Sequence, residues 1–262
     1  MNDSPILSLD REAPAGVAPR APAPRGLDAG TVLVHVFQSL LVSGVPTLML
    51  VGVVMVLGFG MDPFEGGTLS LRFTAMAMFF DTALVALLIL LFLTLGGETS
   101  RGVFVGPRSP IREIVRGLIL VPVTYIGVTA IVMAIRTVAP ALQTVPDNPL
   151  TQFMRSPLDA AIFLVVVVLA GGVREELQRA FVLHKFRQSR IGLGIALVIF
   201  SLLFGALHAD QGWDVAIGVG LLGLFWGILY IRRRSAIMAM TNHAGFNAVQ
   251  VLSQVAANAL GM

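Results

Sequence analysis

Long apolar stretches, separated by short polar segments, follow one another from about residue 33 to the end of the chain. Most of them reach the ~20 residues that a helix needs to cross the hydrocarbon core of a bilayer. The pattern therefore predicts an all-α fold, a polytopic integral membrane bundle with about seven transmembrane helices. We place these helices at residues 33–60, 71–96, 114–135, 158–173, 191–209, 213–231 and 235–260.

The composition agrees with a membrane protein. Of the 262 residues, 56% are hydrophobic and 13% are charged, whereas soluble domains carry about 25% charged residues. The chain has no cysteine, which excludes a disulfide framework, a thiolate nucleophile and a cysteine-ligated metal. Its net charge of +3 is spread over short clusters and does not form the basic stripe of nucleic-acid-binding proteins. We expect a lipid bilayer as partner and no nucleic acid.

The first 30 residues differ from the rest of the chain. They are rich in Ala, Pro, Gly and Arg and contain no apolar run, so they are typical of a disordered tail and not of a cleaved signal peptide. Residues 31–262 are predicted to form one intramembrane helical domain, because we find neither an internal repeat nor a second domain in them.

Basic residues cluster after every second apolar segment and indicate the orientation. They occur between 101 and 116, between 185 and 190 and between 232 and 234, whereas the alternate loops carry mainly acidic residues. The positive-inside rule then predicts a cytoplasmic N-terminus and an external C-terminus. We expect a multi-pass protein of the bacterial inner membrane.

Polar side chains interrupt three of the apolar segments, and in each group the spacing is four residues. An ionisable group at the centre of a bilayer costs roughly 2.5–3.5 kcal/mol on insertion scales, so each one needs a partner or a function. The groups are Glu175, Glu176 and Arg179 in the fourth segment, Phe204 and His208 in the fifth, and His243 and Asn247 in the seventh.

Residues four apart lie on one face of a helix. Glu175 is therefore expected to pair with Arg179, and His243 and Asn247 are expected to face the same point. A carboxylate, two imidazoles and an amide meeting in a low-dielectric pocket could activate water and stabilise an oxyanion.

The depths of these groups in the bundle support their convergence. Glu175 and His208 lie about 21 and 28 Å from the turn near Ser189 at 1.5 Å per residue. His243 lies closer to a cytoplasmic loop than His208 would on straight helices, so a tilt or kink is also expected. Glycines offer places for it, at Gly171–Gly172 and at Gly205.

Taken singly, each group also has a structural explanation. Glu175 with Arg179 could be a surface ion pair, His208 an interfacial histidine, and His243 with Asn247 a source of interhelical hydrogen bonds. It is the combination of the three that favours a functional site.

Four other polar residues, and Phe204 by itself, are assigned structural roles. Phe204 is expected in the core. Asp81, Arg136 and His35 have no partner that can be identified from spacing, and His184 is expected to be a solvated member of a basic loop.

The ordered trio EExxxR, FxxxH and HxxxN, spanning roughly residues 158–258, resembles the motifs of the CPBP family, also called the Abi or CAAX protease family. The resemblance implies an all-helical intramembrane protease. Its prenyl-protein endopeptidases cut the last three residues from a lipidated CAAX protein, so a prenylated chain is one candidate substrate. A signal peptide, a pheromone precursor or another membrane peptide is an alternative.

The resemblance also implies roles for the residues. Glu175 would be the general base that deprotonates a water, and His208 would help to hold that water. His243 and Asn247 would stabilise the oxyanion.

Glu176 and Arg179 match the remaining motif positions, and we assign them orienting and electrostatic support. Family members often have glycine after the motif arginine, where this chain has Ala180. This difference is expected to alter helix packing only.

Metal dependence stays open at this stage, since family members have been described both as metalloproteases and as glutamate-type proteases. Glu175, His208 and His243 could supply three zinc ligands. The H-E-x-x-H zinc signature is absent from the sequence, so we favour hydrolysis without a metal.

Two further function classes remain. A non-catalytic membrane binding or immunity protein could use the same polar cluster to grip a peptide or a lipid headgroup. A small transporter could use it as a proton relay, although no inverted repeat is evident.

Overall fold

The computed structural model describes residues 28–188 and 190–260, and helices dominate this part of the chain. The α-helices are α1 (Ala29–Leu41), α2 (Val45–Val53), α3 (Leu71–Leu95), α4 (Pro110–Val138), α5 (Pro157–Val166), α6 (Glu175–Lys185), α7 (Arg190–Ala206), α8 (Trp213–Arg233) and α9 (Ile237–Ala259). Three segments are π-helical: η1 (Val54–Gly58) follows α2 directly, η2 (Arg101–Val105) lies between α3 and α4, and η5 (Val167–Arg174) joins α5 to α6. The predicted all-α fold is confirmed.

The remaining elements are short. Strands β1 (Phe64–Glu65) and β2 (Thr68–Leu69) form an antiparallel hairpin before α3. Single 3₁₀ turns occur at η3 (Pro140–Leu142), η4 (Pro149–Phe153) and η6 (Ala209–Gln211). The predicted N-terminal tail lies outside the described residues except for its last three positions, where Asp28 caps α1.

All seven predicted segments fall on helical structure, but the count of seven spans is not confirmed. Four helices are long and apolar enough to cross a membrane, namely α3, α4, the rod Pro157–Lys185 and α8. The pair α1 and α2–η1 is bent by 43° and would make a fifth span if taken together. The apolar part of α7 is shorter, and α9 is not among the candidates.

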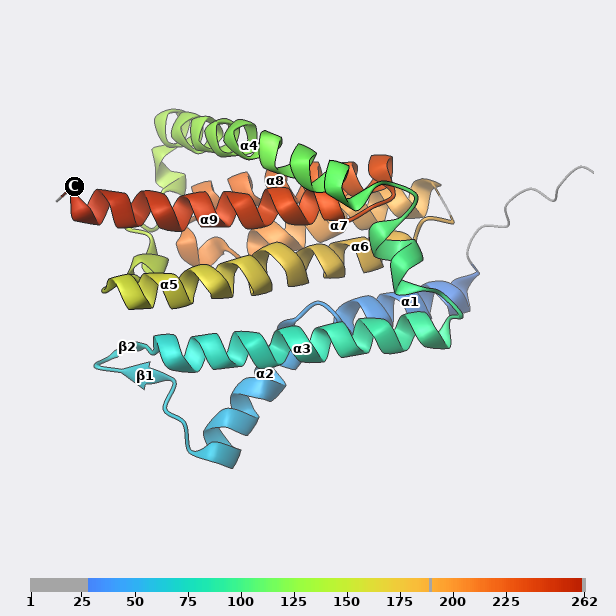
Figure 1. Cartoon of the computed structure of the whole chain (residues 1–262), viewed down its shortest axis with the longest axis horizontal. Coiled ribbons are helices and arrows are strands. Elements are labelled where there is room, and N and C mark those ends of the chain that lie inside the picture. The colour runs from blue at the N-terminus through green and yellow to red at the C-terminus, as the bar shows by residue number, and fades with distance from the viewer. Residues whose placement is uncertain (1–27, 189, 261–262) are drawn as a thin grey trace, which may run out of the picture.

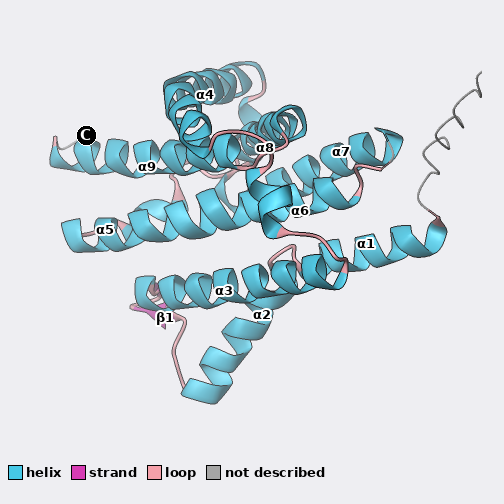
Figure 2. Cartoon of the chain, turned by 45° about the vertical axis from the view of Figure 1, so that its right-hand side comes forward, coloured by secondary structure: helices cyan, strands magenta, loops and turns pink. Residues whose placement is uncertain are grey.

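The helices pack as a bundle in which most long axes run in the same direction (Figure 1). α9 packs against both α4 and η5, and α7 packs against α8. α2 leaves this direction and descends obliquely from the end of α1, as Figure 2 also shows. The outer surfaces carry many exposed aliphatic side chains, which suits contact with lipid, and the chain is an integral membrane protein.

The rod formed by α5, η5 and α6 runs through the bundle (Figure 1). Ser156 caps its first turn through the amide of Asp159, and Pro157 occupies the start of the helix, where a missing N–H costs little. The rod ends in α6, whose side chains are almost all buried. The bundle therefore shields the polar sequence of α6 from lipid.

This burial overturns the prediction that His184 is solvated. The side chain is 5% exposed, and its Nε2 lies 2.5 Å from Oε1 of Glu98. The neighbouring Lys185 places Nζ 2.5 Å from Oε2 of the same carboxylate. Because α6 is surrounded by α1, α3 and η2, its polar end meets partners inside the bundle instead of water.

Candidate functional site

The π-helical segment η5 leads directly into the first residues of the candidate site. It contains Gly171–Gly172, where a distortion was predicted, and its wider turn ends at Arg174, immediately before the two carboxylates that open α6. π-Segments occur frequently at functional sites. Glu176 is 1% exposed, whereas the side chain of Glu175 remains 18% exposed. The two neighbouring carboxylates are therefore in different surroundings, and Glu175 is the more accessible one.

His243 of α9 faces both carboxylates. Its Nδ1 lies 2.9 Å from Oε1 of Glu176, and its Nε2 lies 3.8 Å from Oε2 of Glu175. The structure thus brings together a histidine and two glutamates that are far apart in sequence. Since a carboxylate accepts hydrogen bonds, Glu176 orients the ring through the Nδ1 proton and leaves Nε2 directed at Glu175.

An aromatic side chain that the sequence did not indicate supports this imidazole. The indole of Trp226 stacks on His243, with centroids 3.7 Å apart and an interplanar angle of 16°. Trp226 Nε1 donates to Asn242 Oδ1 at 2.8 Å, and Asn242 Nδ2 donates to the carbonyl of Gly117 at 3.2 Å. The indole ring that stacks on His243 is therefore held in place by two hydrogen bonds, which link it through Asn242 to the backbone of α4.

Arg179 does not pair with Glu175 as the spacing suggested. Its Nη1 instead contacts Oε1 of Glu176, three residues earlier on the same helix. Its guanidinium carbon lies 4.7 Å from the ring centroid of Phe204 and 5.4 Å from that of Trp226, within cation–π range. Because Glu175 and Glu176 both lie about one turn from Arg179, the sequence could not decide between them.

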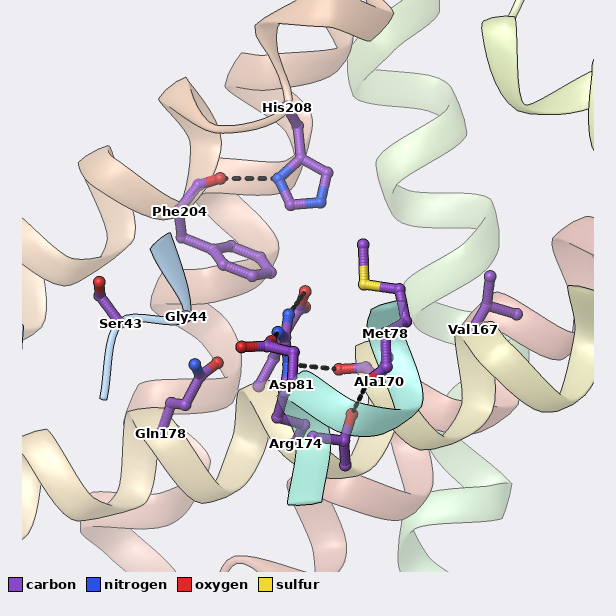
Figure 3. A network of polar contacts seen from close by, with 12 residues as sticks. Ser43, Gly44, Met78, Asp81, Val167, Ala170, Arg174, Gln178, Phe204 and His208 are labelled. Carbon is purple, nitrogen blue, oxygen red and sulfur yellow. Dashed lines mark hydrogen bonds and ion pairs between the residues drawn. The ribbon is translucent and has the colours of Figure 1, made fainter. Parts of the chain in front are cut away.

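His208 follows the last turn of α7. Its Nδ1 lies 2.8 Å from the carbonyl oxygen of Phe204 (Figure 3). A carbonyl only accepts, so Nδ1 donates the hydrogen bond and Nε2 is the ring nitrogen that this bond leaves uncommitted. The Phe204 ring lies 4.9 Å from the His208 ring and 6.1 Å from the His243 ring. Phe204 is a core residue as predicted, and its ring lies near both histidines.

Asn247 lies one turn beyond His243 on α9. Its Nδ2 donates to the carbonyl of Val167 at 3.0 Å, and a Cβ on Gly171 would lie 2.5 Å from this nitrogen. A Cβ on Gly172 would lie 2.5 Å from Cα of Ala244. The two glycines let α9 and η5 approach to backbone contact, which puts the histidine and the asparagine of α9 beside the rod.

Two residues that had no identifiable partner from spacing form ion pairs between helices. Arg136 of α4 places Nε 2.6 Å from Oδ2 of Asp214 at the start of α8. Asp81 of α3 binds Nη1 of Arg174, a residue that no sequence pattern indicated (Figure 3). The only sequence signal for the second pair was a charged residue in the middle of an apolar helix.

Glu175, His208 and His243 are the residues that would hold a zinc ion if one were bound. Among the residues that the structure describes, no three His, Asp or Glu side chains are placed to hold one ion. Both ring nitrogens of His243 face carboxylates, and His208 uses Nδ1 on a backbone carbonyl. We therefore derive no chemical step through zinc.

Comparison with known proteins supports the resemblance seen in the sequence. The family model described as "Type II CAAX prenyl endopeptidase Rce1-like" matches residues 157–249. This segment begins with α5, ends within α9 and contains all three motif groups. No curated protein and no solved structure matches the chain.

Proposed function

We propose that this chain, whose residues 157–249 are similar to the type II CAAX prenyl endopeptidases, is an intramembrane endopeptidase with Glu175 as its general base. It would hydrolyse a peptide bond in a membrane-associated protein or peptide. The observation that carries the proposal is the unequal pair of carboxylates around His243, one buried against Arg179 and the other accessible.

The first step would be activation of water. Glu175 removes a proton from a water molecule held beside it, and the resulting hydroxide attacks the carbonyl carbon of the peptide bond. The second O–H of that water can donate a hydrogen bond to Nε2 of His208, because Nδ1 of the same ring is bonded to the carbonyl of Phe204.

The second step would be collapse of the tetrahedral intermediate. The amide of Asn247 has a second N–H besides the one donated to Val167, and it can donate to the oxyanion. His243 can donate to the oxyanion from Nε2 when that nitrogen carries a proton. Glu175 then returns its proton to the leaving amine, so the base is regenerated.

Replacing Glu175 by Gln tests this proposal. The variant keeps the shape of the side chain and removes the base, so we expect hydrolysis to fall at least ~100-fold. The assay would follow a pool of lipid-anchored fluorescent peptides, prenylated and acylated, in vesicles that contain the purified protein. Glu65→Gln, in the exposed hairpin, is the matched control and should cleave like the unaltered protein.

Unchanged cleavage by the Glu175→Gln variant would reject the endopeptidase proposal. If no peptide is cleaved but the peptides bind to both forms equally, the non-catalytic binding protein becomes the better explanation. Product masses would identify the bond that is cut and so separate a CAAX-type substrate from other membrane peptides.

We further propose that the N-terminus is cytoplasmic and that the protein resides in a bacterial inner membrane, on the basis of the basic loops. The absence of cysteine makes the test direct, since one introduced thiol is the only one to react. Ser100 lies in the segment between α3 and α4, and Asp147 lies in the segment between α4 and α5, so Ser100→Cys and Asp147→Cys probe opposite ends of α4. An impermeant maleimide added to intact cells should label only the second, and the reverse pattern would overturn the orientation.

A further inference from the structure

A buried ion pair lies next to the proposed base and involves a helix outside the family-matched segment. Asp81 is fully buried in α3, a candidate membrane span, and its Oδ2 contacts Nη1 of Arg174. An unpaired charge at such a place would be costly, and a pair gains little over apolar packing. Stability alone is therefore a weak reason for this pair.

The guanidinium of Arg174 is held at three points. Nη1 binds Asp81, Nε donates to the carbonyl of Ala170 at 3.3 Å, and Nη2 lies 3.5 Å from Oε1 of Glu175. Figure 3 shows the side chain extending between Asp81 and the backbone of its own helix. Because the guanidinium is planar and two of its nitrogens are already bonded, the direction of its third nitrogen, Nη2, toward the carboxylate of Glu175 is fixed.

The two oxygens of Glu175 are consequently not equivalent. Oε1 faces Arg174, whereas Oε2 faces Nε2 of His243 at 3.8 Å. Asp81 is the nearer anion for the arginine, so it takes up much of the positive charge. Glu175 is thereby oriented without being engaged in a close ion pair that would weaken it as a base.

The break between α1 and α2 closes the remaining side of this arrangement. Gly44 has φ +87°, and a Cβ there would lie 3.2 Å from Nη1 of Arg174 and 3.0 Å from Nε2 of Gln178. Gln178 in turn donates to the carbonyl of Val42 at 2.6 Å. The chain bend thus fits directly against the arginine, and a side chain at the bend would displace it.

We propose that Asp81 and Arg174 are a positioning pair that aims the carboxylate of Glu175 at its water, a role that rests on the proposed endopeptidase function. Arg174 acts on the base, and Asp81 acts through Arg174. Neither residue belongs to the three motif groups, and Asp81 lies outside residues 157–249.

A double-mutant cycle tests the pair. Arg174→Gln leaves a buried unpaired Asp81, and we expect kcat to fall about 100-fold with KM changed less than about threefold. Asp81→Asn leaves the arginine free to close on Glu175, and kcat should fall about 10-fold. Because Asp81 acts through Arg174, the double variant should be no slower than Arg174→Gln alone, so the two effects on kcat are not additive, and Arg174→Lys should keep part of the activity.

The ion pair between Arg136 and Asp214 is the matched control, because it also joins two helices but touches none of the site residues. Asp214→Asn should lower the unfolding temperature and leave kcat per folded molecule unchanged. If the cycle at Asp81 and Arg174 shows this same pattern, the pair is structural and the positioning role is wrong.

A glycine pair covers the case in which the charge variants fail to fold. Gly44→Ala should reduce kcat about 10-fold by displacing Arg174, by analogy with other small misplacements of catalytic groups. Gly67→Ala has nearly the same strained backbone, φ +81°, but meets no atom within 4 Å, and it should retain activity. Equal activity of the two variants would also overturn the positioning role.

The failure of this proposal differs from the failure of the proposed function. If Glu175→Gln loses cleavage but the variants of Asp81 and Arg174 keep the kcat of the unaltered protein, only the positioning role is rejected. If Glu175→Gln still cleaves, the endopeptidase function itself is rejected.

Discussion

α4 and α6 differ in both polarity and burial: α4 is a long apolar helix that is largely exposed, and α6 is a short polar helix that is largely buried. α4 has 29 residues, and only 11% of an apolar stretch of 18 residues within it is buried inside the protein. α6 has 11 residues, among them two glutamates and an arginine, and nearly all of its side chains are buried. In lipid the apolar helix can form the outside, while the polar helix must satisfy its charges within the bundle. The contrast shows that the helix with the candidate site residues is the one shielded from the bilayer by the rest of the bundle.

The largest expected effect comes from breaking a charge pair inside α6. Arg179→Ala leaves the carboxylate of Glu176 buried without its cation, which should cost about 3–5 kcal/mol of unfolding free energy. On the lipid-facing side of α4, Ile119→Ala changes a side chain that is 67% exposed and should cost far less. Unfolding of both variants in the same detergent would measure the difference, and equal losses would contradict the contrast between the helices.

A smaller difference is expected from two glycines. Gly172→Ala places a Cβ 2.5 Å from the backbone of Ala244 and should separate η5 from α9, at a cost of about 1–3 kcal/mol and with a loss of cleavage. Gly127→Ala in α4 meets no atom within 4 Å and should stabilise that helix by up to about 1 kcal/mol. Thermal unfolding and cleavage of both variants check this, and a stabilised, active Gly172→Ala would show that the close crossing is unnecessary.

The smallest effect concerns the polar end of α6, where Glu98 lies in the loop after α3. Burial opposes ionisation of Glu98, but hydrogen bonds from Lys185 and His184 together hold its pKa below the usual range. A lowered carboxyl pKa contributes stability above the pKa of the unfolded chain, and this stability is lost as the pH falls through the folded value. Unfolding temperatures measured between about pH 3 and pH 6 should therefore decline less in Glu98→Gln than in the unaltered protein. Parallel profiles would show that the carboxylate adds nothing.

The sequence predicted the helical membrane fold, because long apolar runs define membrane helices. It also raised the convergence of Glu175 with His208, His243 and Asn247, and the structure places Oε2 of Glu175 3.8 Å from Nε2 of His243. It could not predict which carboxylate binds Arg179, since both lie about one turn away. The assignment of functional roles to these residues stays a prediction.

The sequence patterns could not predict which side chains of different helices contact each other. The pair of Asp81 with Arg174 and the stacking of Trp226 on His243 join residues from different helices, and no spacing rule relates such positions. The prediction for His184 was wrong because hydropathy treats a polar segment as solvated, whereas a neighbouring loop here supplies the carboxylate.

The π-helical segment η5 has a consequence for how the site keeps its alignment. A π-turn accommodates more residues than an α-turn, so the direction of Glu175 depends on the local count of residues as well as on their identity. Deleting one residue from η5 would remove a residue that widens the turn, so the shortened segment would tighten toward the 3.6 residues per turn of an α-helix. The wide winding of η5 thus helps to set where the carboxylate of Glu175 lies relative to the imidazole of His243, in addition to the identity of the polar side chains.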